Sequence, residues 1–280
     1  MDFKQFSNLI MIEQTLFALP FALLGTLFAG GGTITDWILV IIAVSSARTA
    51  GMSFNRVIDA KIDARNPRTK DRLVARGEIS PSVVWLTALV SSVILVFSAF
   101  LLNDLCFYLS FPAVFLLFTY SFFKRFSASS HVYLGVVEAA APIGGYLAVT
   151  GELSFLPFIL GAVILFWIAG LDMVYALQDE AFDRKENLKS IPAVYGRKKT
   201  VLFSSVSYGM AILFLLLAGA LAHRGQAFYI GVLLISAIFV YQQLLARKED
   251  ITAAIPPFFK VNMLISPILF FSMFIDVYLG

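Results

Sequence analysis

Two short groups of oxygen-bearing side chains stand out because their members recur every four residues. The first group is Asn55, Asp59 and Asp63, and the second is Asp179 and Asp183. Residues four apart lie on one face of a helix, one turn above the other. Like charges at this spacing destabilise a helix, and Mg²⁺, which prefers carboxylate oxygens, waters and phosphates, would offset that repulsion. The spacing therefore predicts two helical stripes of metal ligands.

Cationic side chains follow both acidic groups along the chain. Arg72 lies in a basic stretch after the first group, and Lys189 lies in another after the second. Tyr120 and Lys124 are four residues apart where an apolar block ends. Guanidinium and ammonium groups neutralise phosphate oxygens directly. Arg72, Lys124 and Lys189 are therefore our candidates for binding a diphosphate beside the metal.

The elements that carry these groups are predicted to be membrane-spanning helices. Of 280 residues, 59% are hydrophobic and 14% are charged, whereas roughly 25% are charged in a soluble domain. The apolar residues form blocks long enough to cross a bilayer, where lipid leaves the backbone no partners outside a helix. We predict an all-α polytopic membrane protein with one domain over residues 1–280. The nine predicted spans are 9–30, 37–58, 82–102, 105–123, 132–149, 155–178, 200–222, 227–246 and 260–279.

The distribution of basic residues predicts the orientation of the chain. Of the 21 lysines and arginines, all except Arg48, Arg56 and Arg224 fall in loops or ends on one predicted side of the membrane. Because such residues collect on the cytoplasmic side, the N-terminus is predicted inside and the C-terminus outside. Both acidic groups then face the cytoplasm. The composition leaves no soluble basic domain, so the expected surroundings are lipid and not nucleic acid.

Asp172 lies inside the sixth predicted span, seven residues before Asp179 and about two helical turns deeper. An ionisable group within a span is costly and is by default a candidate for function. Acids at the ends of spans can instead be charges solvated at the membrane surface. Because the four-residue spacing occurs twice, four spans apart, we favour a functional interpretation of both groups and of Asp172.

Together these features resemble the UbiA superfamily of intramembrane aromatic prenyltransferases. The first group matches the first aspartate-rich motif of that family, and Asp172 with residues 175–179 and Asp183 matches the second. Further similar segments are 15–22, 66–69, 120–126 and 188–192. Glu13 and Glu138 depart from the family pattern, and either is a candidate contact for the acceptor.

The resemblance implies nine transmembrane helices around a central cavity, capped on the cytoplasmic side by the two aspartate-bearing loops. It also implies Mg²⁺-dependent transfer of a polyprenyl group from polyprenyl diphosphate to an aromatic acid in quinone biosynthesis. The chain is most similar to the 4-hydroxybenzoate polyprenyltransferase branch. Residues 54–56 and 175–180 are also similar to menaquinone-pathway enzymes that prenylate a dihydroxynaphthoate. The expected location is the cytoplasmic membrane of a prokaryote-like cell.

These inferences combine into a mechanistic hypothesis. The residues expected to coordinate Mg²⁺ are Asn55, Asp59, Asp63, Asp179 and Asp183. The metal would hold the diphosphate and offset the charge that grows on it as the C–O bond breaks. A ring carbon of the acceptor would then attack the allylic cation. Asp172, a first-motif aspartate or Tyr120 would orient the acceptor hydroxyl, and the sequence leaves open which group takes the proton.

An ion-coupled membrane transporter is the alternative from a different class, since acids within membranes also mark ion pathways. Transporters usually place such acids near the bilayer midplane on broken helices. Here most of the acids lie at one predicted face, beside basic loops suited to phosphate. This placement favours the prenyltransferase interpretation.

Overall fold

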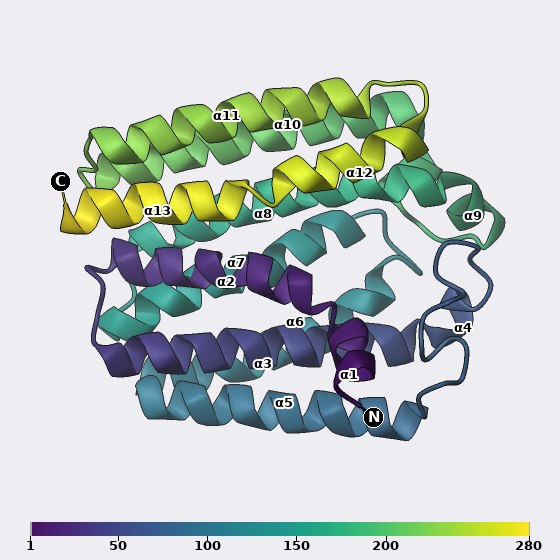
Figure 1. Cartoon of the computed structure of the whole chain (residues 1–280), viewed down its shortest axis with the longest axis horizontal. Helices are drawn as coiled ribbons and strands as arrows, with labels where there is room; N and C mark the ends of the chain where they lie inside the picture. Colours follow the sequence, from purple (N-terminus) through teal and green to yellow (C-terminus); the bar gives the residue numbers. More distant parts are fainter. Residues whose placement is uncertain (1, 280) are drawn as a thin grey trace. The chain divides into compact units, whose positions relative to one another are not determined.

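A computed structural model describes residues 2–279, except for the side chains of residues 13–18. Glu13 and the first part of the segment 15–22 therefore lie outside the described side chains. All regular structure in the described residues is helical (Figure 1). Eight helical segments of that part are long and apolar enough to cross a membrane. The prediction of an all-α polytopic membrane protein is confirmed.

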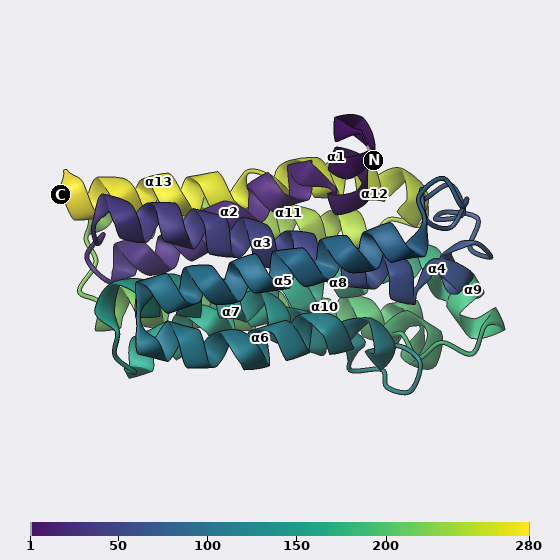
Figure 2. The same cartoon turned by 90° about the horizontal axis from the view of Figure 1, so that it is seen from below.

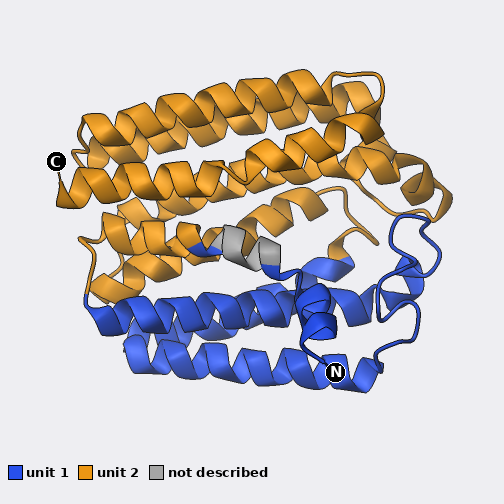
Figure 3. Cartoon of the chain, in the orientation of Figure 1, with its two compact units in different colours: residues 1–19, 33–122 blue, residues 20–32, 123–280 orange. Residues whose placement is uncertain are grey.

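The chain divides into two compact units, of which the first comprises residues 1–19 and 33–122 (Figure 3). The division falls inside α2 and at the end of α6, so the first unit holds the first acidic group. The prediction of a single domain over the whole chain stays a prediction. The helices from the N-terminus to the end of α6 are α1 (Phe3–Ile10), α2 (Ile12–Phe28), α3 (Ile34–Ile58), α4 (Ala60–Asp63), α5 (Pro81–Leu102) and α6 (Asp104–Phe123).

The second unit comprises residues 20–32 and 123–280 and holds the second acidic group. Its long helices follow the predicted spans, but two of those spans are interrupted. The predicted sixth span continues through a 3₁₀ turn into a short helix, and the last, 260–279, contains the end of one helix and the whole of the next. The helices are α7 (Ser130–Thr150), α8 (Phe155–Tyr175), η1 (Ala176–Asp179), α9 (Glu180–Lys185), α10 (Ile191–Leu221), α11 (Gln226–Ala246), α12 (Ile251–Asn262) and α13 (Ile265–Tyr278).

The first predicted span, 9–30, corresponds to α2, which has 17 residues. The continuous part of α2 with described side chains, Leu19–Phe28, is apolar. The predicted loop 179–199 is also partly helical, because α9 occupies its start and α10 begins at Ile191. Ser190 caps α10 by accepting a hydrogen bond from the Ala193 backbone N–H, and a proline in the first turn needs no such partner.

In the first unit, α3 and α5 lie side by side along their lengths (Figures 1 and 2). Small side chains on one face of α5 allow this close approach, as is usual between helices in lipid. Ala50 and Phe54 of α3 pack with Ala88 of α5 in one buried cluster. The opposite face of α5 exposes large apolar side chains, among them Leu86 and Val93. This pattern suits a helix that presents its outer face to lipid.

In the second unit, α8 packs against both α7 and α10. The C-terminal part of α2 approaches α7 through a reciprocal pair of glycines. A Cβ atom at Gly25 would lie 2.1 Å from the Pro142 carbonyl oxygen, and one at Gly145 would lie 2.0 Å from the Ala22 carbonyl oxygen. Both distances are far below van der Waals contact. Glycine at these two positions is therefore what brings the helices together.

Candidate active site

The first acidic group spans a break between two helices. Asp59 ends α3 and precedes α4, with φ −91° and ψ 1°. The backbone N–H of Asp59 nevertheless bonds the Asn55 carbonyl at 2.9 Å, and that of Asp63 bonds the Asp59 carbonyl at 2.8 Å. The four-residue hydrogen-bond spacing is kept across the break. Ile58, the last residue of the predicted span 37–58, is also the last residue of α3, so the predicted stripe of ligands extends over two helices, α3 and α4.

The second acidic group repeats this arrangement in the other unit. Asp179 ends the 3₁₀ turn η1 and precedes α9, with φ −99° and ψ 2°. Asp183 lies in α9 and is 6% exposed, and its counterpart Asp63 is 4% exposed. Each motif thus consists of an aspartate at a helix junction and a buried aspartate four residues later.

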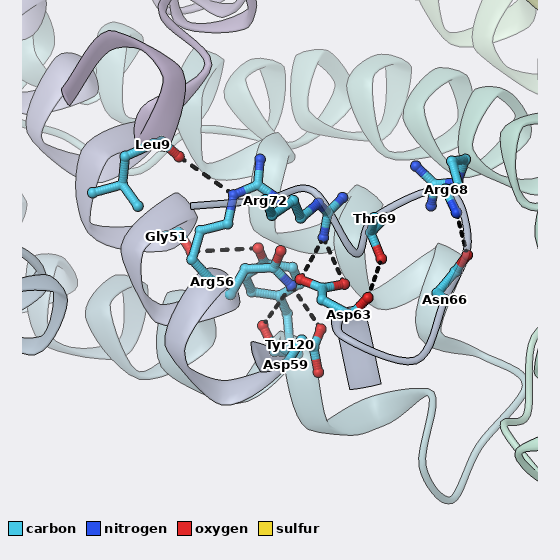
Figure 4. Close-up of polar contacts among 12 residues, drawn as sticks. Leu9, Gly51, Arg56, Asp59, Asp63, Asn66, Arg68, Thr69, Arg72 and Tyr120 are labelled. Carbon is cyan, nitrogen blue, oxygen red and sulfur yellow. Dashed lines mark hydrogen bonds and ion pairs between the residues drawn. The ribbon is translucent and has the colours of Figure 1, made fainter. Parts of the chain in front are cut away.

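The carboxylates of the first motif already have protein partners. Asn55 Nδ2 donates to Asp59 Oδ2 at 2.9 Å and to Ser121 Oγ at 3.2 Å. Arg72 Nη1 donates to both oxygens of Asp63, at 2.8 and 2.7 Å (Figure 4). Because an unpaired buried charge is costly, this ion pair accounts for the burial of Asp63. Arg72, predicted to bind diphosphate, contacts a predicted metal ligand in this structure.

The loop after α4 brings Arg72 back to Asp63. The Asn66 side chain accepts a hydrogen bond from the Arg68 backbone N–H at 2.9 Å, which makes a local turn (Figure 4). Thr69 Oγ1 then donates to the Asp63 carbonyl at 3.2 Å. Asn66 and Thr69 are both buried. Hydrogen bonds of the segment 66–69 therefore attach the loop to the end of α4.

Tyr120 and Arg56 attach the first motif to neighbouring elements. The Tyr120 hydroxyl donates to the Gly51 carbonyl at 3.3 Å, one turn before Asn55 on α3 (Figure 4). The buried Arg56 donates from Nε to the Leu9 carbonyl at 3.4 Å. The Tyr120 hydroxyl, predicted to orient the acceptor, thus bonds the backbone of the motif's own helix.

In the second unit, one segment connects the predicted lysines with Asp183. The Lys189 backbone N–H donates to the Lys124 carbonyl at 2.6 Å, and the Leu188 N–H donates to the Asp183 carbonyl at 2.8 Å. Ser190, the residue after Lys189, is buried and caps α10 through its hydroxyl. The Lys189 side chain is exposed, and that of Lys124 is half-buried. The backbones of Lys124, Asp183 and Lys189 therefore lie close together.

Asp172 forms a pair that sequence reasoning missed. Its Oδ2 lies 2.7 Å from His131 Nδ1, and His131 Nε2 accepts a hydrogen bond from the Ile191 N–H at 3.2 Å. The only sequence signal for His131 was a histidine at the start of an apolar span. Glu138 lies on the same helix, α7, and is half-buried.

The donor atoms of the two motifs suit Mg²⁺. All are carboxylate or amide oxygens, which hard cations prefer. Among the described residues, no group of three or more histidine, cysteine, aspartate or glutamate side chains is arranged to hold a metal by itself. Mg²⁺ usually binds proteins through one or two carboxylates plus waters and substrate phosphates. A pair of aspartates in each motif fits this mode of Mg²⁺ binding. The carboxylate oxygens of Asp63 would then contact both the metal and the Arg72 guanidinium.

Comparison with known proteins identifies the family. Residues 18–264 match the model of the UbiA prenyltransferase family. A 4-hydroxybenzoate octaprenyltransferase from Vibrio campbellii is 28% identical over 253 residues, which cover 88% of this chain and 85% of the relative. The match extends over both acidic motifs.

Solved structures agree with this result. The apo structure of a UbiA homologue from Aeropyrum pernix K1 has a TM-score of 0.87 and 31% identity, over 95% of this chain and 98% of that one. A UbiA homologue from Archaeoglobus fulgidus bound to GPP and Mg²⁺ has a TM-score of 0.72 and 17% identity, over 96% and 99% of the two chains. At that identity the likeness concerns the fold alone. The chain belongs to the UbiA prenyltransferase family, and it is a membrane prenyltransferase.

Proposed function

We propose that the protein transfers a polyprenyl group from polyprenyl diphosphate to an aromatic acid, with 4-hydroxybenzoate as the acceptor, in quinone biosynthesis. The observation that carries this proposal is the repeated motif. Asp59 and Asp179 have similar φ and ψ, and each precedes a buried aspartate by four residues. Arg72 contacts Asp63, and the backbones of Lys124 and Lys189 lie near Asp183. Two such sets suit a diphosphate with its metal ions. The Vibrio campbellii relative supports the choice of acceptor by its name.

Mg²⁺ is the proposed cofactor, held by the acids of both motifs together with Asn55. When bound, it offsets the negative charge that develops on the leaving diphosphate. The Mg²⁺ and GPP bound to the Archaeoglobus fulgidus homologue support this assignment. The buried carboxylates of Asp59, Asp63 and Asp183 are the protein's contribution, since their positions are set by helix junctions and hydrogen bonds.

The cationic side chains serve the diphosphate in this proposal. Lys124 and Lys189 meet through a backbone hydrogen bond beside Asp183, so their charges lie in one region of the second unit. Arg72 holds Asp63 and also supplies positive charge at the first motif. Their shared role is to bind phosphate oxygens and to stabilise the leaving group.

Asp172 is the proposed group for orienting the acceptor hydroxyl, with Tyr120 as the second candidate. The C–O bond of the donor breaks, and its electron pair leaves with the diphosphate. The ring carbon ortho to the hydroxyl then bonds the allylic carbon, and the ring proton passes to a base. Asp172 is a carboxylate whose side chain is 27% exposed, so it is accessible to a ligand and able to accept a proton.

The same proposal includes the orientation in the membrane. The N-terminus and both motifs face the cytoplasm, and the C-terminus lies on the other side, in the cytoplasmic membrane of a prokaryote-like cell. The basic loops that carry Arg72 and Lys189 support this orientation. A donor with a charged head and a hydrocarbon tail suits a site at the membrane boundary.

One assay tests both the reaction and the acceptor. Purified protein receives a polyprenyl diphosphate with 4-hydroxybenzoate and 1,4-dihydroxy-2-naphthoate side by side, with Mg²⁺ or with EDTA. Mass spectrometry of the products should show prenylated 4-hydroxybenzoate in the Mg²⁺ sample only. Prenylation of the naphthoate alone would show that it, and not 4-hydroxybenzoate, is the acceptor. The naphthoate is the second candidate because residues 54–56 and 175–180 are similar to menaquinone-pathway enzymes. Turnover that persists in EDTA would show that the reaction does not require Mg²⁺.

A further inference from the structure

The imidazole of His131 joins three helices of the second unit. His131 lies at the start of α7, Asp172 lies near the end of α8, and Ile191 is the first residue of α10. The His131 side chain is 5% exposed, and that of Asp172 is 27% exposed. A buried side chain with both ring nitrogens hydrogen-bonded has one orientation. The mechanism proposed above does not use this residue.

The hydrogen bonds determine which nitrogen carries the proton. The Ile191 backbone N–H can only donate, so His131 Nε2 must accept with its lone pair. The ring proton then lies on Nδ1, from where it is donated to Asp172 Oδ2 over 2.7 Å. In an imidazolium, His131 Nε2 would also carry a proton, and that N–H would face the Ile191 N–H with no acceptor between them. The geometry therefore describes a neutral imidazole bonded to a carboxylate.

This bond leaves part of Asp172 available. It uses Oδ2, and among the described residues no hydrogen bond reaches Oδ1. A carboxylate attached at one oxygen loses its free rotation and presents the other oxygen in a set direction. Hydrogen-bond partners that orient metal ligands in this way contribute about 10- to 100-fold in affinity or activity.

Ile191 also connects this pair with the diphosphate side of the site. It follows Leu188 and Lys189, whose backbone N–H groups donate to the Asp183 carbonyl and the Lys124 carbonyl. The segment 188–191 therefore touches the acids and lysines proposed for the donor. Its last N–H holds the imidazole that orients Asp172.

We propose that His131 is a positioning residue for the acceptor half of the reaction. It holds Asp172 so that Oδ1 faces the acceptor hydroxyl, and it ties this orientation to the segment 188–191. The inference rests on the proposed function, since it assigns Asp172 to the acceptor. A purely structural pair would serve only to connect α7, α8 and α10.

Two conservative variants separate these roles. In His131→Asn the amide nitrogen takes the place of Nδ1, so it donates to Asp172 but leaves the Ile191 N–H without its acceptor. In His131→Gln the amide oxygen takes the place of Nε2, so it accepts from Ile191 but leaves Asp172 without its donor. His131→Ala removes both bonds. His223→Asn is the control, because His223 is exposed and its φ of 50° suits asparagine.

The kinetic readout compares acceptor and donor in all four variants. We expect His131→Ala and His131→Gln to lower kcat/KM for 4-hydroxybenzoate by about 10- to 100-fold. His131→Asn should recover most of that loss, and the KM for the polyprenyl diphosphate should stay within about twofold of wild type in both amide variants. Equal losses in His131→Asn and His131→Gln, or unchanged acceptor kinetics in both, would overturn the positioning role. If His131→Ala fails to fold, the two amide variants still decide the question.

A spectroscopic test does not depend on turnover. The chain has two histidines, so ¹⁵N-histidine labelling of wild type and His223→Asn assigns the ring signals of His131. Protonation at Nδ1 with a bare Nε2 is expected, and the opposite tautomer would contradict the inference. If wild type prenylates no aromatic acid, the proposed function fails, whereas the tautomer still reports the His131–Asp172 bond. If wild type is active but His131→Asn and His131→Gln do not differ in acceptor kinetics, the inference about His131 fails and the proposed function stands.

Discussion

Asp59 and Asp179 have nearly the same backbone conformation, with φ and ψ of −91° and 1° for the first and −99° and 2° for the second. Each lies at a junction where one helical segment ends and a short helix begins. Each also precedes by four residues an aspartate that is at most 6% exposed. A four-residue sequence repeat thus corresponds to a repeated structural device in two compact units.

This likeness predicts similar consequences for the two aspartates. Asp59→Ala and Asp179→Ala should each lower kcat by at least about 100-fold, because each removes a proposed ligand of the Mg²⁺ that offsets charge on the leaving group. Product formation by mass spectrometry measures the loss, and membrane insertion should be unchanged. Asp71→Ala is the matched control, since Asp71 is exposed in the loop after the first motif and should keep full activity. Full activity of Asp59→Ala or Asp179→Ala would remove that residue from the site.

The Arg72–Asp63 ion pair should contribute to stability as well as to activity. Arg72→Ala leaves a buried carboxylate without its guanidinium, which should cost roughly 1–3 kcal/mol of unfolding free energy. Thermal unfolding in detergent measures the effect as a lowered Tm. The double variant Arg72→Ala/Asp63→Asn should recover part of the Tm, because the buried negative charge of Asp63 is gone. It should recover none of the activity, because a proposed metal ligand is gone as well.

The control for this ion pair is Arg76→Ala. Arg76 pairs with Glu78 at 2.6 Å, but the two side chains are 52% and 39% exposed. Exposed ion pairs contribute little to the free energy of unfolding, so the Tm of Arg76→Ala should match that of wild type. A Tm loss in Arg76→Ala as large as in Arg72→Ala would show that loop charge in general, and not the buried pair, sets the stability.

The approach of α2 and α7 predicts a contrast between neighbouring glycines. Gly145→Ala would place a Cβ atom 2.0 Å from the Ala22 carbonyl oxygen, so the helices must separate and the Tm should fall. Gly144→Ala meets nothing within 4 Å and should leave the Tm unchanged or raise it, since alanine favours helix by about 1 kcal/mol over glycine. Equal Tm values for the two variants would count against the described packing of these helices.

The proposed orientation predicts which loops an impermeant thiol reagent can reach. The single cysteine, Cys106, is buried and is replaced by serine for this test. Glu152→Cys, in the exposed loop between α7 and α8, should react in intact cells. Lys70→Cys, in the exposed loop after the first motif, should react only after lysis. The reverse result would place the motifs on the outer face.

Most of the fold could be predicted from the sequence, because a membrane span is a local property of hydropathy. The predicted spans 82–102 and 105–123 agree closely with α5 (Pro81–Leu102) and α6 (Asp104–Phe123). The prediction was weaker at the short helices that follow the spans, α4 and α9. The break at Asp59 has no signal in composition, since backbone hydrogen bonds continue across it with the spacing of a helix.

The sequence by itself determined the class of protein and the two acidic motifs, since four-residue spacing and apolar blocks are read along the chain, and its short motifs carried the resemblance to the family. Only the tertiary structure decided which side chains those acids meet. His131 and Asp172 are 41 residues apart, and Asn55 and Ser121 are 66 apart, so their contacts depend on how helices pack. Even the pairing of Arg72 with Asp63 required the loop to fold back. Packing, unlike hydropathy, is a relation between distant segments, and no single stretch of sequence contains it.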